Sequence, residues 1–203
     1  MDNFVITSAS QVNGADVRNA RLGARFGRMD LMSQLVLLAV ERLGVDFEAR
    51  PRERIGICLA THAGSVSTDV EYWKGRNTAG GLSPTLFTYT LPSAAIGEIA
   101  IRHRLTGPNL CFVGDDAALL AEAGDMIRRG ETVAWVCVGC DSITAAAAEL
   151  IRAPVVAQAR ALFLERDGEG LAWSPENGRD MASLCVKFFA RKSATETNHA
   201  SLA

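Results

Sequence analysis

The amino-acid sequence predicts an α/β fold in which a mixed five-stranded sheet carries helices on both faces. Short apolar and β-branched runs, typical of buried strands, lie at Ile55–Thr61, Leu110–Val113 and Val133–Val138. Between these runs, apolar residues recur at the spacing of an amphipathic helix. Strands that alternate with helices in this way pack as a sheet covered by helices.

Two of the expected helices carry clear boundary signals. The first runs from about Asp30, whose side chain can cap the N-terminus, to Leu43, and a glycine follows it. The second begins at the adjacent carboxylates Asp115 and Asp116, directly after the 110–113 strand and a glycine. Three further helices are expected at residues 65–74, 93–104 and 144–152.

The two ends of the chain complete the expected fold. A strand is predicted at Phe4–Ser8. The late segments Val155–Glu165 and Met181–Ala190 are predicted to be an antiparallel pair of strands joined by a hairpin-like loop. Residues 191–203 show no periodicity, and we expect them to be a disordered tail. The length of 203 residues then favours one domain, over residues 1–190.

Composition excludes several classes of function. Lys and Arg total 21 and Asp and Glu total 23, so the formal net charge of −2 argues against a broad nucleic-acid surface. There is no apolar run long enough for a membrane span, and the N-terminus lacks the basic start of a secretory signal. Five cysteines in mostly apolar surroundings suit reduced thiols, so we expect a cytoplasmic protein.

The most informative stretch is 105–130, LTGPNLCFVGDDAALLAEAGDMIRRG. It predicts a turn, a short strand, a sharp turn and a helix. This arrangement resembles the nucleophile region of β-ketoacyl synthases. The preceding segment, LSPTLFTYTLPSAAIGEIAIRHR, and the following one, ETVAWVCVGCDS, are similar to the flanks of that region. NFVITSASQVNG and RFGRMDLMSQLVLLAVERLG resemble the first strand and the first long helix of the family, so the resemblance runs in order over about 165 residues.

The resemblance implies the N-terminal half of a thiolase-like fold. A complete ketosynthase is about twice as long and has two such halves, so this chain corresponds to half a ketosynthase. In the family the nucleophilic cysteine lies nine positions after the Gly of Gly-Pro, and counting from Gly107 this position is Asp116. The two histidines that the family uses come from the half that has no counterpart here. We therefore expect no catalytic residue of the family type.

Several residues are weighed as candidates for a site. An aspartate at a helix start is favoured by the helix dipole, so Asp115 or Asp116 is interpreted as an N-cap. Cys111, the nearest thiol, is predicted to be a buried structural residue. His62 follows a strand at the edge where α/β sheets bind ligands, and it could line a pocket. Cys137 and Cys140 form a CxxC, but side chains three apart on a strand face opposite sides, so neither a metal nor a cofactor is expected.

The function that the resemblance implies is that of a non-catalytic, chain-length-factor-like partner of a full-length ketosynthase. The setting would be type II fatty-acid or polyketide synthesis, for example of aryl polyenes, with an acyl carrier protein and a homo- or heterodimer. Phe87, Tyr89 and Leu91, on an expected ordered loop, are predicted to line the dimer interface and the acyl tunnel. The alternatives are an acyl-thioester decarboxylase or hydrolase that uses Asp116 or His62, and a stand-alone acyl-binding module.

Overall fold

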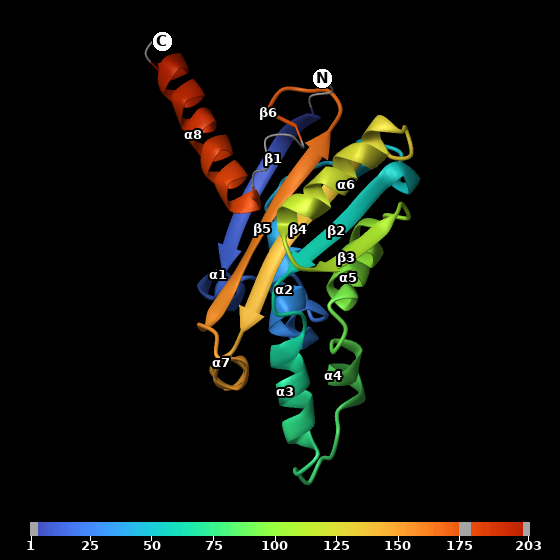
Figure 1. The fold of residues 1–203 in the computed structure, drawn as a ribbon, viewed down its shortest axis with the longest axis vertical. Helices are drawn as coiled ribbons and strands as arrows, with labels where there is room; N and C mark the ends of the chain where they lie inside the picture. The colour runs from blue at the N-terminus through green and yellow to red at the C-terminus, as the bar shows by residue number, and fades with distance from the viewer. Residues whose placement is uncertain (1–3, 175–179, 201–203) are drawn as a thin grey trace.

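The computed structural model describes residues 4–174 and 180–200, and it is built on one mixed six-stranded sheet in the order β3-β2-β4-β5-β1-β6 (Figure 1). The strands are β1 (Phe4–Asn13), β2 (Ile55–Thr61), β3 (Asn109–Val113), β4 (Ala134–Ile143), β5 (Val156–Glu165) and β6 (Leu171–Trp173). The strand β2 is parallel to both β3 and β4, whereas β5 is antiparallel to β4 and β1. The sheet therefore has six strands and not the five of the predicted sheet, and β6 was not predicted.

The helices are α1 (Gly14–Asn19), α2 (Leu31–Glu41), α3 (Val66–Gly75), α4 (Pro84–Thr88), α5 (Ser93–His103), α6 (Asp116–Arg128), α7 (Ala145–Ile151) and α8 (Met181–Ala200). Helices α2 and α5 pack on one face of the sheet, and α6 and the beginning of α8 pack on the other. Alternate side chains of β4 enter the two cores, since Val136 and Val138 face α2 while Trp135 and Cys137 face α6. This confirms the predicted α/β fold with helices on both faces.

The predicted strand at Met181–Ala190 is wrong, because this segment is the first half of helix α8. Met181, Leu184 and Cys185 are fully or almost fully buried against the sheet, and their spacing is helical. A different set, Leu184, Val186 and Phe188, alternates along the same segment, and this alternation led to the wrong prediction of a strand. The antiparallel neighbours of β5 are instead β4 and β1. Helix α8 continues through residues 191–200, where the sequence predicted a disordered tail, and residues 201–203 lie outside the described part.

The strand before α6 lies where the sequence predicts it, but at the edge of the sheet and not in the core. We predicted a buried strand, whereas β3 is an edge strand that pairs only with β2 among the described strands. Its last three residues, Cys111, Phe112 and Val113, are exposed. The apolar run that looks like a core strand is therefore a surface of the isolated chain. No helix in the described ranges is long and apolar enough to cross a membrane.

The Gly107-Pro108 turn has a structural reason for its glycine. A Cβ atom added at Gly107 would lie 2.2 Å from the carbonyl oxygen of Ile55 at the start of β2. We predict that Gly107→Ala lowers the free energy of unfolding by about 1–3 kcal/mol, because backbone must shift to make room. Urea denaturation measures the difference. Gly27→Ala is the matched control, since a Cβ atom there meets nothing within 4 Å, and an equal loss in both variants would contradict the explanation.

Candidate functional site

A small polar pocket lies at the carboxyl ends of the parallel strands β2 and β4, where α6 begins. It has a volume of about 50 Å³ and is lined by Ala60, His62, Asp116, Gly139, Cys140, Asp141, Gln158 and Arg160. We call it the Asp116 pocket. The fold thus brings together Asp116 and His62, two of the residues that the sequence singled out, although they lie far apart in the chain.

Asp141 holds His62 and the loop that follows β2. Its Oδ2 lies 3.0 Å from Nδ1 of His62, and its Oδ1 accepts hydrogen bonds from the amide of His62 at 2.8 Å and from the hydroxyl of Thr61 at 3.1 Å. The imidazole is oriented through one ring nitrogen, while 72% of the His62 side chain stays exposed. Sequence reasoning missed Asp141, although it is the acidic residue at the end of the segment ETVAWVCVGCDS.

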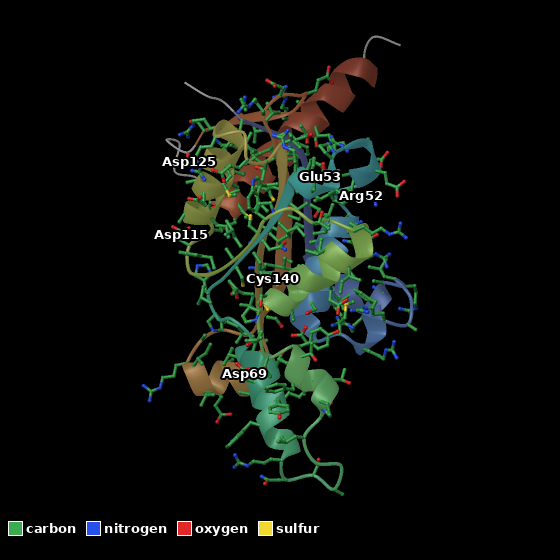
Figure 2. All side chains as sticks on the ribbon, turned by 90° about the vertical axis from the view of Figure 1, so that its right-hand side faces the viewer. Arg52, Glu53, Asp69, Asp115, Asp125 and Cys140 are labelled. Carbon is green, nitrogen blue, oxygen red and sulfur yellow. The ribbon has the colours of Figure 1, made fainter. Side chains whose placement is uncertain are left out.

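The two carboxylates at the start of α6 have different roles. Asp115 is the N-cap, as predicted for one of the pair, because its Oδ1 accepts the amide hydrogen of Ala117 at 2.9 Å; Figure 2 shows it at the beginning of the helix. Asp116 instead points into the pocket, and its Oδ1 accepts the amide hydrogen of Met181 in α8 at 3.3 Å.

The electrostatic surroundings of Asp116 are unfavourable for acyl transfer. Burial raises the pKa of the Asp116 carboxyl above its ordinary value, and the nearby charges of Asp180 and Asp115 raise it further. The Met181 amide and His62 act in the opposite direction and lower this pKa. A carboxylate here would repel the negative charge that develops on the oxygen during acyl transfer, where enzymes place hydrogen-bond donors instead.

The surroundings of Cys111 and Cys140 do not favour a reactive thiolate. The prediction that Cys111 is buried is wrong: it is exposed on β3 and does not line the pocket. Desolvation nevertheless raises the pKa of its thiol, which disfavours the reactive thiolate. Cys140 lies inside the molecule (Figure 2), and burial raises the pKa of its thiol well above the ordinary value. Cys137 belongs to the core on the opposite face of the sheet, so the CxxC is not a redox pair.

The predicted interface residues separate into two groups. Phe87, on α4, is 59% exposed and its ring packs against Tyr72 with 5.4 Å between centroids, while Leu91 is 65% exposed. Tyr89 is buried, and its hydroxyl donates a hydrogen bond to Glu98 of α5 at 3.0 Å. Arg25 binds the same carboxylate at 2.7 Å. Tyr89 thus anchors the segment from inside, whereas Phe87 and Leu91 present apolar surface to the outside.

The segments that carry these residues lie along the same side of the fold as the edge strand β3 (Figure 1). The strand β3 and the helices α5 and α4 follow one another down the right-hand side of Figure 1. We define the edge surface as the exposed apolar residues of these segments and of the turn between α4 and α5, namely Phe87, Leu91, Ile101, Phe112 and Val113. Within the described residues, β3 has a strand partner on one side only, so its other backbone edge is open.

Comparison with known sequences identifies the family. The sequence profile of the N-terminal domain of β-ketoacyl synthases matches residues 9–171. Helix α8 and the last residues lie beyond the matched region. No curated protein matches the chain by sequence.

Solved structures of similar fold come from the same family. "The ishigamide ketosynthase/chain length factor" matches with a TM-score of 0.68 and 20% identity over 80% of this chain. The complex "Ketosynthase (ApeO) in Complex with its Chain Length Factor (ApeC) from Xenorhabdus doucetiae" matches with a TM-score of 0.62 and 14% identity over 82%. AntDE, a type II polyketide ketosynthase in complex with its acyl-carrier protein AntF, matches with a TM-score of 0.65 and 16% identity over 81%.

The lengths of these relatives differ. The match covers 62% of the ishigamide protein and 62% of the AntDE chain, so this chain spans less than two thirds of either. It covers 80% of the matched chain in the Xenorhabdus complex. At identities of 20% or less, these likenesses establish the thiolase-like ketosynthase fold.

Proposed function

This chain belongs to the β-ketoacyl synthase family, and we propose that it is a non-catalytic, chain-length-factor-like partner of a full-length β-ketoacyl-ACP synthase. The pathway would be a type II fatty-acid or polyketide synthesis of the aryl-polyene kind, with the growing chain on an acyl carrier protein. The observation that carries the proposal is an open, apolar sheet edge in a chain that has an aspartate where the family has its nucleophile.

The open edge supports association with another chain. Unpaired amide and carbonyl groups along an edge strand are a template for adding a further strand, and monomeric proteins usually cover or charge such edges. Here Phe112 and Val113 on β3 are apolar and exposed, and Leu91 is exposed in the preceding segment. An incoming ketosynthase would extend the sheet and bury this surface. The similar structures support this choice of partner, since two of them are described as ketosynthases with chain length factors.

The Asp116 pocket supports a non-catalytic role. Its volume of about 50 Å³ is far below that of ligand pockets, which are roughly 300–1,000 Å³. Cys140 lines the pocket, but burial raises the pKa of its thiol well above the ordinary value, and Cys111 is on the edge strand and does not line the pocket. Condensation would therefore take place in the partner, and this chain would shape the space that receives the acyl group.

One observation favours the alternative of an acyl-thioester hydrolase or decarboxylase. Asp141 orients the His62 ring through Nδ1, which leaves Nε2 as a possible base toward water, and Asp116 shares the pocket. If this chemistry were present, the isolated chain would turn over acyl thioesters, and His62→Ala would abolish the turnover.

We predict that the isolated protein forms no acyl-enzyme and consumes no thioester. The measurement is incubation with acyl- and malonyl-loaded carrier protein, followed by intact mass analysis of both proteins. The expected result is an unmodified chain and an intact thioester after a time in which a full-length ketosynthase reacts completely. A stable adduct on Cys111, or thioester loss that depends on His62, would contradict the non-catalytic proposal.

A further inference from the structure

The first turns of α8 are part of the core of the domain. Met181, Leu184 and Cys185 are fully or almost fully buried, and they share a core with residues of β1, β5 and α6. The helix then extends away from the sheet, as Figure 1 shows. The family match ends at residue 171, so α8 lies beyond the matched region.

The junction between α8 and the sheet lies at Asp116. The carboxylate accepts the amide hydrogen of Met181, and Asp180 accepts that of Ser183 at 2.7 Å. Two aspartates therefore accept hydrogen bonds from amides in the first turn of α8, which have no partner within the helix. A Cβ atom placed on Gly139 would lie 3.3 Å from Oδ2 of Asp116 and 3.3 Å from the sulfur of Met181. The carboxylate and the sulfur of Met181 therefore both lie directly beside Gly139.

We propose that Asp116 is a positioning residue for α8, and that the seated helix fills the space beside the former nucleophile position. The carboxylate fixes the first amide of the helix, Met181 covers Gly139, and the buried face of α8 completes the second core. The position that the family uses for covalent chemistry thus holds the C-terminal helix in place. This inference does not depend on the partner, because every contact in it lies within one chain.

The reactivity of Cys185 reports directly whether α8 is packed against the sheet. Cys185 is fully buried on the inner face of α8, and burial raises the pKa of its thiol to about 11, so it reacts with a thiol reagent only when the helix lifts. Cys58 and Cys137 are buried in β2 and β4, which α6 covers, and the side chain of Cys140 belongs to the core on the opposite face, so we expect release of α8 alone to leave these thiols protected. The four thiols therefore distinguish local release of α8 from global unfolding.

The experiment measures maleimide labelling of each thiol by peptide mass analysis, in a Cys111→Ser background that removes the exposed cysteine. Asp116→Leu deletes the acceptor at similar volume and should raise the labelling rate of Cys185 by roughly 2- to 10-fold, the effect of one lost hydrogen bond. The other three thiols should keep their rates. Asp116→Asn, which retains a side-chain oxygen, should stay within about twofold of the parent for Cys185.

Gly139→Ala tests the same junction without touching the carboxylate, since the added methyl group must displace either Asp116 or Met181. It should also raise the labelling rate of Cys185 selectively. An unchanged Cys185 rate in the folded variants would overturn the proposal. So would an equal increase for all four thiols, because Asp116 would then support general stability only.

Discussion

Replacing Val113 by lysine should prevent this chain from binding its ketosynthase partner. Val113 is 64% exposed at the end of β3, so the substitution leaves the core of the isolated domain intact. A lysine on an edge strand blocks the addition of another strand, because its charge would have to be buried in the new interface. Loss of a central interface contact costs about 2–4 kcal/mol, which corresponds to a Kd increase of roughly 30- to 1,000-fold.

Leu150→Lys is the matched control for this variant. Leu150 is 68% exposed on α7 and does not belong to the edge surface, so its substitution introduces the same charge elsewhere. Both variants would be co-expressed with full-length ketosynthases from the same genome, and the Kd of each purified pair would be measured by calorimetry. If Val113→Lys binds as tightly as Leu150→Lys, the partner does not use the edge of β3.

Replacing Phe87 by alanine should lengthen the product of the reconstituted pair without abolishing condensation. We propose that Phe87 forms part of the wall that ends the acyl tunnel of the partner. A hydrophobic wall discriminates by about 1–3 kcal/mol per methylene, enough to stop elongation at a preferred length. Because Phe87 is 59% exposed in the isolated chain, its truncation should leave the fold intact, and the cost expected for a core phenylalanine should not appear.

The measurement is the mass distribution of products released by the reconstituted pair. Trp73→Ala is a suitable control, because Trp73 is an exposed aromatic residue of α3 outside the edge surface. It should leave the length distribution unchanged. A folded Phe87→Ala variant with an unchanged distribution would show that this residue does not limit chain length.

The elements that the sequence predicts well are those with local signals. Asp30 caps α2 as expected, since its Oδ1 accepts the amide hydrogen of Ser33 at 2.9 Å. The predicted strand Ile55–Thr61 coincides with β2, which is buried along its whole length. The beginning of helix α8 was wrongly predicted as a strand, because apolar residues of the segment 181–190 can be chosen at a helical or at an alternating spacing. The short strand β6 was not predicted, because three residues are too few to show an alternating pattern.

The candidate site depends on contacts that no local pattern contains. Thr61 and His62 meet Asp141 from about 80 positions away, because β2 and β4 are neighbours in the sheet. The environment of Cys111 depends on strand order as well. An apolar run of this length suits a central strand, and only the position of β3 at the edge of the sheet makes the thiol exposed.

The exposed thiol of Cys111 allows the most direct test of the proposed interface. It is the middle residue of β3, and the other four cysteines are buried, so a thiol reagent should label this position alone in the isolated folded protein. In complex with the full-length ketosynthase, the account predicts that the labelling rate of Cys111 falls by at least about tenfold, since the added strand covers the edge. A stable complex in which Cys111 reacts as fast as in the free chain would contradict pairing through β3.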